Sequence, residues 1–381
     1  MSEYVGFDVS KEETSFCVKD VSGKILSRGK VATDPAALFE ALRDHCVCPS
    51  RIVLETGTLS GWLSRELGKL GIAVDVIDAR QANAVMKLQH NKTDANDAAL
   101  LAEIARTGFC RPVAVKSAAA QEDRILLKAR AHLVRHRRDM QNTIRGLLGS
   151  LGIRFPWGWG KLAGREALEG RPELSTTIEP RLRAAAALGR EIARLDKAVS
   201  ARAKDDPAVR LLMTVPGVGP VTALAFAATI GDAGRFAKSR TVGAYIGLTS
   251  RRWQSGEMDY SGRISKHGDS MLRALLYEAA NSLLTVVRKA HPLKDWAAPG
   301  EEADQPQEGL RGAGAQAGGD PASHADHRRG LPLAAKGGRC INGHEQTHRF
   351  RVSGRPVPRR DGGRGDLASL VANWIPIRDC A

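Results

Sequence analysis

The sequence has few cysteines and no long hydrophobic run. Its six cysteines are scattered and show no repeated spacing typical of a zinc site or a disulfide framework. No apolar run is long enough to span a bilayer, and the N-terminus enters a strand-like segment without the pattern of a signal peptide. These absences predict a protein of the reducing cytoplasm that does not enter a membrane.

Acidic residues are in deficit as well. The 381 residues include 57 Lys and Arg against 42 Asp and Glu, which gives a formal net charge of +15. Such an excess favours a polyanionic partner, most simply nucleic acid. The alternative is a basic surface that is merely solvated. The length allows two or three domains with cores of their own.

The N-terminal part of the chain has the pattern of an α/β layer. Residues 4–28 predict three short strands joined by turns. The segment Pro35–His45 predicts a short amphipathic helix. A strand, a helix and another strand are then expected, at Arg51–Glu55, around Trp62–Leu70 and at Ala73–Ile77. Three strands followed by alternating helices and strands is the order of an RNase H-like mixed sheet.

Four acidic residues stand out in this layer. Asp8 and Glu55 each end a strand-like run. Asp94 and Asp97 lie three residues apart at the start of an apolar helix, so they share one helical face. A divalent-metal site for phosphoryl transfer needs such an arrangement, because hard oxygen ligands hold Mg²⁺ and two ions can clamp a phosphodiester.

The middle of the chain predicts two long helices. Residues Ala118–Leu151 are helical and rich in Arg and Lys, and Glu179–Ala203 forms the second helix, each with an apolar stripe. Two such helices joined by a loop make a hairpin or a coiled-coil arm. The arm either packs on itself as a linker, or joins copies of the chain and also contacts phosphates.

Residues 211–231 resemble a helix-hairpin-helix element. Pro216 stops one helix, while Gly217 and Gly219 permit a tight turn whose backbone N–H groups can face a phosphate. As a generic connector between helices, the same turn needs no ligand.

A second cluster of polar residues runs from Ser250 to Arg273. Small glycines beside its serines allow a phosphate backbone to approach, and its cations can stabilise charge that develops on phosphorus. The alternative is a phosphate-binding loop whose serines only donate hydrogen bonds. The serines are Ser255, Ser261, Ser265 and Ser270, and the basic residues are Arg251, Arg252, Arg263, Lys266, His267 and Arg273.

These motifs, taken in order, resemble a known family. The matching stretches are Tyr-Val-Gly-Phe-Asp-Val-Ser-Lys (4–11), Val-Leu-Glu-Thr-Gly (53–57), Asn-Lys-Thr-Asp-Ala-Asn-Asp-Ala (91–98), Pro-Gly-Val-Gly-Pro (216–220), Ile-Gly-Asp-Ala (230–233), Gln-Ser-Gly-Glu (254–257) and Gly-Arg-Ile-Ser-Lys-His-Gly-Asp (262–269). Over residues 4–296 the chain resembles the transposases of the insertion-sequence group called IS one-ten, which also includes Piv-like DNA invertases. Several motifs in register are more specific than any one of them.

The resemblance implies a DNA transposase or site-specific recombinase. It implies a RuvC-like N-terminal domain, a coiled-coil arm and a mainly helical C-terminal transposase domain. The metal site would consist of Asp8, Glu55, Asp94 and Asp97, with Mg²⁺ as the cofactor. Such an enzyme cleaves and exchanges DNA strands.

The resemblance also implies a serine nucleophile that forms a covalent phosphoserine link to DNA. Ser255 in Gln-Ser-Gly-Glu matches best, and Ser265 is the second choice. The family further implies a homo-oligomer, a dimer or a tetramer, and a structured guide RNA, called a bridge RNA, that pairs with target and donor DNA. The residues expected to contact nucleic acid are Gly217, Gly219, Arg251, Arg252, Arg263 and Lys266.

The expected boundaries are 1–115 for the RuvC-like domain, 116–205 for the arm, 206–296 for the C-terminal domain and 297–381 for an irregular tail.

The tail is crowded with Gly, Ala, Pro, Arg and Gln and shows no periodicity. Back-translated in a shifted frame, residues 298–335 can encode the basic helix that relatives should have there. We therefore expect a frameshift near residues 296–298. The alternative is a genuine disordered basic tail.

A zinc-like motif lies within this tail. His-Glu-Gln-Thr-His at 344–348 has the spacing of a zinc site, but no apolar helix surrounds it and glycines precede it. We therefore do not expect zinc there.

Two other functions fit the same residues. A structure-specific nuclease of the RuvC type would use water in place of serine and would not rejoin strands. A decayed transposase would bind nucleic acid without cutting it.

Overall fold

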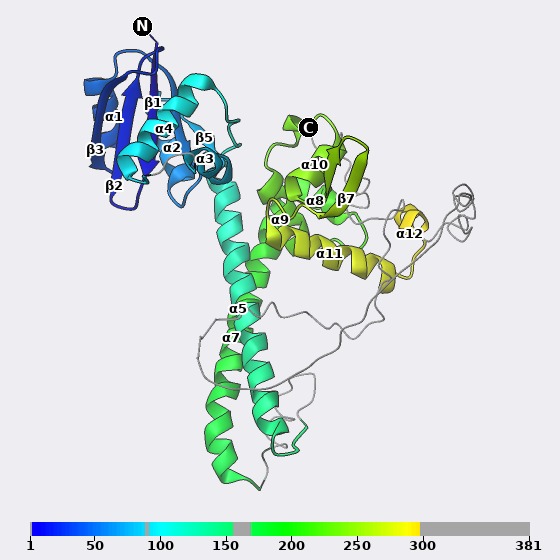
Figure 1. Cartoon of the computed structure of the whole chain (residues 1–381). Helices are drawn as coiled ribbons and strands as arrows, with labels where there is room; N and C mark the ends of the chain where they lie inside the picture. The colour runs from blue at the N-terminus through cyan, green and yellow to red at the C-terminus, as the bar shows by residue number, and fades with distance from the viewer. Residues whose placement is uncertain (1, 88–90, 155–167, 169, 298–381) are drawn as a thin grey trace, which may run out of the picture.

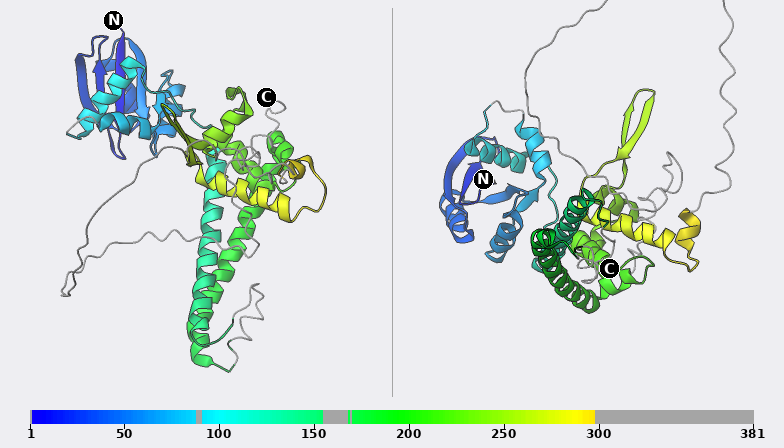
Figure 2. Two further views of the ribbon diagram at one scale, coloured as in Figure 1. Left: turned by 45° about the vertical axis from the view of Figure 1, so that its right-hand side comes forward. Right: turned by 90° about the horizontal axis from the view of Figure 1, so that it is seen from below.

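An N-terminal α/β domain and a C-terminal helical body adjoin the same end of a long helix pair (Figures 1 and 2). The computed structural model describes residues 2–87, 91–154, 168 and 170–297. The expected frameshifted tail, its zinc-like motif and most of the connection between the long helices lie outside these residues. None of the helices in the described ranges combines the length and apolar character needed to span a bilayer.

Five strands form the N-terminal sheet, in the order β3-β2-β1-β4-β5. β2 is antiparallel to both β1 and β3, whereas β4 and β5 run parallel to β1. This confirms the predicted mixed sheet with the RNase H-like strand order. The strands are β1 (Glu3–Val9), β2 (Glu13–Lys19), β3 (Ile25–Ala32), β4 (Pro49–Glu55) and β5 (Asp75–Ile77).

Helices cover both faces of this sheet because its central strands carry apolar residues on both sides. On one face, Val5, Phe7 and Leu54 are buried in a core with α1 and α2. On the other face, Val53 and Cys17 pack against α4, and α3 extends this second layer. The helices are α1 (Pro35–His45), α2 (Ser60–Lys69), α3 (Ala79–Met86) and α4 (Asp94–Thr107).

α4 lies directly on β1, with no side chain between the two backbones. A Cβ atom added to Gly6 would come within 2.2 Å of Ala102 N and 2.3 Å of Ala98 O. Real Cβ atoms do not approach backbone atoms that closely, so only glycine allows this contact. The face of β1 that carries Gly6 is therefore the face that α4 covers.

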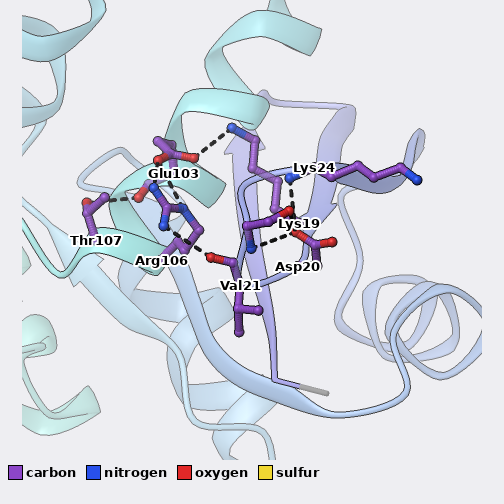
Figure 3. Close-up of polar contacts among 8 residues, drawn as sticks. Lys19, Asp20, Val21, Lys24, Glu103, Arg106 and Thr107 are labelled. Atoms are coloured by element: carbon purple, nitrogen blue, oxygen red, sulfur yellow. Dashed lines mark hydrogen bonds and ion pairs between the residues drawn. The ribbon is translucent and has the colours of Figure 1, made fainter.

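Ion pairs at the C-terminal end of α4 show in which direction the helix runs over the sheet (Figure 3). Lys19 Nζ, at the end of β2, donates to Glu103 Oε2 at 3.0 Å, and Arg106 also pairs with Glu103. The hydrogen bonds from Arg106 and then Lys19 lower the pKa of Glu103 to about 2. Since Lys19 pairs with Tyr4 at the start of β1, α4 runs antiparallel to β1, and its first turn reaches the strand end that carries Asp8.

Two long helices pack antiparallel beside each other (Figure 1). Near the C-terminal body, Arg202 Nη1 lies 2.6 Å from Asp123 Oδ1. Near the far end, Ile144 and Ile178 are fully buried against each other's helix. The helices are α5 (Ala118–Gly149) and α7 (Pro172–Asp205).

The C-terminal body has one apolar core and carries a two-stranded hairpin. Leu224, Ile246 and Leu272 are buried in this core beside Leu127 and Val199 of the helix pair, so the pair and the body share it. The hairpin is exposed along both strands, and the sequence predicted only a polar cluster there. The elements are α8 (Pro207–Met213), α9 (Pro220–Ile230), η1 (Ala233–Arg235), α10 (Ser239–Ile246), β6 (Ser250–Ser255), β7 (Met258–Ile264), α11 (Ser270–Thr285) and α12 (Pro292–Ala297).

Candidate active site at the strand ends

Asp8 and Glu55 end two neighbouring parallel strands. Phe7 of β1 is in register with Leu54 of β4, so the next residues, Asp8 and Glu55, lie side by side. Side chains alternate along a strand, and Asp8 lies two residues from Gly6. Asp8 and Glu55 therefore both lie on the face of the sheet that α4 covers.

Asp94 and Asp97 occupy the first turn of α4. The helix begins because the Thr93 hydroxyl caps it, accepting a hydrogen bond from Asn96 N at 3.2 Å. The positive end of the helix dipole favours acids at these positions. Asp97 is buried and Asp94 is exposed. Because α4 runs antiparallel to β1, both acids lie toward the end of the sheet that carries Asp8.

The four carboxylates influence one another electrostatically. The pKa of Asp8 is raised, first by burial and then by the negative charges of Asp97 and Asp94. The pKa of Glu55 is also raised, first by burial and then by the charge of Asp8. The raised pKa values of Asp8 and Glu55 reflect a local excess of negative charge, which a bound cation would offset.

Two lysines partly supply that charge in this conformation. Lys30 Nζ of β3 lies 2.9 Å from Asp94 Oδ2, and this pairing lowers the pKa of Asp94. Lys92 Nζ lies 3.9 Å from Asp97 Oδ2. The two acids of the α4 turn are thus paired with cationic side chains, whereas Asp8 and Glu55 are not paired with a basic residue in the described part of the chain.

The donor atoms suit a divalent cation, although they are not gathered into a ligand set. Glu55 Oε2 is buried and has no hydrogen-bond partner among the described residues, as expected for an oxygen that would face a metal. Across the described ranges, however, no three His, Cys, Asp or Glu side chains stand close enough to hold a metal ion. The chemistry of the four acids fits Mg²⁺, and a change of their side-chain positions would be needed to bind it.

Ser255 lies in the C-terminal body, at the tip of the β6–β7 hairpin. It is exposed and pairs with Met258 across a turn in which Gly256 has a φ of +55°. Ser265 lies at the base of the hairpin, where its N–H donates to Thr249 O at 2.8 Å. Among the residues that the structure describes, no hydrogen bond or ion pair links Ser255 to the four acids, so the structure does not bring the two groups together.

The residues expected to contact nucleic acid fall into two places. Gly217 has a φ of +91°, and a Cβ there would come within 2.6 Å of Ala279 O in α11, so close packing alone requires this glycine. Gly219 is the N-cap of α9. Arg251, Arg252, Arg263 and Lys266 lie exposed on or just after the hairpin. Arg252 forms an ion pair with Asp259 across the two strands.

Side chains of α3, of α5 and of the segment just before α5 also contact the C-terminal body. Arg80 Nη1 of α3 lies 2.8 Å from His267 Nδ1. Lys116 Nζ donates to Thr229 O at 2.6 Å, and Arg124 Nη2 lies 2.7 Å from Asp269 Oδ2. The imidazole of His267 thus contacts a side chain of the N-terminal domain in this conformation.

Sequence reasoning missed Lys30 and the aromatic pair Trp253 and Tyr260. Lys30 is opposite Ser15, and Ser15 is opposite Asp8, so its position near the acids follows only from the sheet register. The rings of Trp253 and Tyr260 stack across the hairpin at a centroid distance of 5.7 Å. The alternation of Met258, Tyr260 and Ile264 with polar residues could have suggested the second strand of this hairpin.

Comparison with known proteins relates these features to one group of transposases. A family model for DEDD transposases of the IS110 (IS one-ten) group, described as Transposase, matches residues 5–153. A second model, described as Transposase IS116/IS110/IS902 family, matches residues 209–294. The two matches contain the four acids and the hairpin, respectively.

Curated relatives and a solved structure match as well. A probable family 20 transposase of Pseudomonas aeruginosa is 33% identical over 62% of this chain and 72% of its own length. The transposase for insertion sequence element IS1111A of Coxiella burnetii is 31% identical over 74% of this chain and 78% of its own length. T. thermophilus RuvC in complex with a Holliday junction substrate is covered completely by 30% of this chain, at 16% identity and a TM-score of 0.22. So low a score carries no argument, and the strand order supports the fold assignment.

Proposed function

The chain belongs to the IS116/IS110/IS902 family of transposases and is therefore an enzyme, and we propose that it cleaves and exchanges DNA strands with a divalent metal at the strand-end acids and a serine nucleophile. The observation that supports this most is the position of Asp8 beside Glu55 under the first turn of α4. A cluster of negative charges favours a bound cation, and so does the buried Glu55 Oε2, which has no hydrogen-bond partner among the residues that the structure describes.

Asp8, Glu55, Asp94 and Asp97 would hold the metal, for which we propose Mg²⁺. Bound there, Mg²⁺ would polarise the scissile phosphate and stabilise charge on the attacking and leaving oxygens. Lys30 and Lys92 would exchange their present partners for the incoming polyanion, since each is an exposed cation at the edge of the site. The cation would favour the ionised forms of Asp8 and Glu55, whose pKa values are raised, first by burial and then by neighbouring acids.

Ser255 would act as the nucleophile. Its Oγ gives up its proton and forms a bond to phosphorus while the bond from phosphorus to one deoxyribose oxygen breaks. The released oxygen takes up a proton and becomes a free hydroxyl, so no net proton is gained or lost. The phosphoserine ester keeps the energy of the broken bond, so a second hydroxyl can displace the serine and join a new strand. Since Ser255 is not beside the acids, this step requires either a movement of the hairpin or a hairpin from a second copy.

The helical arm, the α8–α9 turn and a guide RNA would also take part in this reaction. The α5–α7 arm would join copies of the chain, and its exposed Lys128 and Arg135 would contact phosphates. The α8–α9 turn at Gly217 and Gly219 would serve as the helix-hairpin-helix contact. A structured guide RNA would select the DNA. We place the enzyme in the cytoplasm, where DNA and a reducing environment coexist.

Covalent trapping tests this proposal. Full-length protein is incubated with Mg²⁺, a plasmid that carries the flanking DNA of the element and RNA transcribed from the same flank, and protein–DNA adducts are then counted after denaturation. We expect an adduct that Ser255→Ala and Asp8→Asn abolish and that Ser265→Ala retains.

The same assay separates the alternatives. Free DNA ends without an adduct, unchanged by Ser255→Ala, would indicate a RuvC-type nuclease. Binding that needs no metal and is never followed by cleavage would indicate a decayed transposase. An adduct that Ser265→Ala abolishes and Ser255→Ala retains would move the nucleophile to the base of the hairpin.

A further inference from the structure

The β6–β7 hairpin carries an exposed pair of stacked aromatic rings. Trp253 and Tyr260 are directly opposite each other in the antiparallel register. Their ring centroids are 5.7 Å apart and their planes differ by 26°. The two residues are 53% and 65% exposed, so most of the ring surface faces water. Packing in a buried core therefore does not explain why these two rings are in contact.

A glycine makes room for the tryptophan ring. A Cβ atom on Gly262 would come within 2.4 Å of Trp253 Cζ3. The ring therefore lies over the backbone of β7, toward the base of the hairpin, and leaves its outer surface open. The hairpin thus presents exposed aromatic surface, on which a nucleobase can stack.

The aromatic pair lies on the same face of the hairpin as Ser255. Ser255 and Met258 form the next directly paired positions after Gln254 and Asp259. Side chains alternate along a strand, so Ser255 shares its face with Trp253 and lies about 7 Å farther along β6. That distance is close to the spacing between successive phosphates of an extended strand, so a base on the rings would have its own phosphate near Ser255.

The charge around the rings is complementary to a nucleic acid. Arg251, Arg263 and Lys266 are exposed on or just after the hairpin. The opposite face is occupied by the ion pair of Arg252 with Asp259. Exposed aromatic rings on an element that also carries cations can bind unpaired bases by stacking and their phosphates by charge.

We propose that the Trp253–Tyr260 pair stacks on an unpaired DNA base that adjoins the phosphate attacked by Ser255. The placement next to the scissile phosphate rests on the proposed function of Ser255. The aromatic pair would hold the DNA strand so that the scissile phosphate lies beside Ser255. This binding mode requires that the DNA be unpaired at the point of cleavage. A paired base is not available to the rings, because its faces are covered by its neighbours in the duplex.

Fluorescence titration of the full-length protein tests this proposal. The probe is a single-stranded oligodeoxynucleotide that contains 2-aminopurine, whose fluorescence is quenched on stacking, and a duplex of the same sequence serves for comparison. We expect Trp253→Ala and Tyr260→Ala each to weaken single-strand binding about tenfold and to remove the quenching. Duplex binding should change little, and Trp253→Phe should retain most of the single-strand affinity.

Three further variants sharpen the test. Gln254→Ala, on the opposite face of the same hairpin, should bind like the wild type. Gly262→Ala keeps both rings and all charges but displaces the Trp253 ring, so it should weaken single-strand binding without unfolding the hairpin. Ser255→Ala should bind and quench normally, because stacking does not need the nucleophile. This separates failure of the present proposal from failure of the serine assignment.

Several results would overturn the proposal. Wild-type binding and quenching in both aromatic variants would do so, as would an equal loss for single strands and duplex. Tight binding of unpaired RNA with no response to the DNA probe would assign the surface to another ligand. A fall in oligomer size in Trp253→Ala, with DNA binding unchanged, would show that a second copy of the chain covers the rings.

Discussion

Lys30 Nζ lies 2.9 Å from Asp94 Oδ2 and joins the last of three antiparallel strands to the first turn of α4. Lys30 is opposite Ser15, which is opposite Asp8, so the lysine extends across the same end of the sheet as the candidate metal ligands. It thus holds Asp94 while no cation is present. Its presence also gives a physical reason why the four acids do not form a ligand set in this conformation.

Removing this lysine should strengthen metal binding. In Lys30→Met, Asp94 loses its cationic partner and the site becomes more negative, so Mn²⁺ should bind severalfold more tightly in the absence of DNA. The measurement is titration of free Mn²⁺ by electron paramagnetic resonance. Lys24→Met, which removes an exposed lysine from the turn before β3, is the matched control and should leave the affinity unchanged. Equal or weaker Mn²⁺ binding in Lys30→Met would rule out the competition.

The close contact between β1 and α4 should be intolerant of any side chain at Gly6. In Gly6→Ala the new Cβ would meet backbone atoms of Ala98 and Ala102, which cannot move aside cheaply. We expect the free energy of unfolding of the N-terminal domain to fall by at least about 2 kcal/mol. Urea denaturation followed by circular dichroism measures this. Gly68→Ala, in α2 with no atom near the new Cβ, should be neutral or slightly stabilising, and an equal loss in both variants would contradict the account.

The ion pairs at the other end of α4 should make stability depend on pH. The pKa of Glu103 is lowered to about 2, chiefly by Arg106 and then by Lys19, so its folded form is stabilised when ionised. This contribution is complete above the unfolded pKa near 4.5 and is lost as the pH falls toward 2.

Glu103→Gln tests this dependence. It should cost roughly 1–2 kcal/mol of unfolding free energy at pH 7, after allowance for solvent screening, and almost nothing near pH 2. Denaturation at several pH values checks the trend, and a cost that stays constant with pH would exclude the ionic explanation.

Asp8 should have the opposite dependence in metal-free protein. Its pKa is raised by burial and by the charges of Asp97 and Asp94, so its ionised form destabilises the fold, and stability is lost as the pH rises through the folded pKa. In the presence of a chelator, Asp8→Asn should therefore raise the melting temperature at pH 7.5, and the gain should shrink as the pH falls to 4. A gain that Mg²⁺ does not reverse in favour of the wild type would count against a metal role for Asp8.

The sequence predicted the parts whose position depends on burial. Asp8 and Glu55 could be found because each follows a run of apolar residues that must lie in the core, and α4 because Thr93 caps an apolar helix. The order of strands and helices along the chain followed from the same alternation of buried segments.

Other parts depend on pairing rather than burial. The β6–β7 hairpin is exposed along both strands, so it buries no apolar face, and the alternation of Met258, Tyr260 and Ile264 with polar residues is its one local signal. Its two strands pair across the turn at Gly256. Lys30 reaches Asp94 only because of the strand register, which the sequence does not show. The separation of Ser255 from the acids likewise depends on how the C-terminal body sits on the helix pair.

Metal-directed backbone cleavage tests the central claim most directly. Fe²⁺ in place of Mg²⁺, with ascorbate and peroxide, produces radicals that cut the polypeptide beside the bound ion, and mass spectrometry locates the cuts. The account predicts cuts at the ends of β1 and β4 and at the start of α4, around Asp8, Glu55 and Asp94, and their loss in a protein carrying both Asp8→Asn and Glu55→Gln. Cuts confined to other regions, or an unchanged pattern in the double variant, would contradict it.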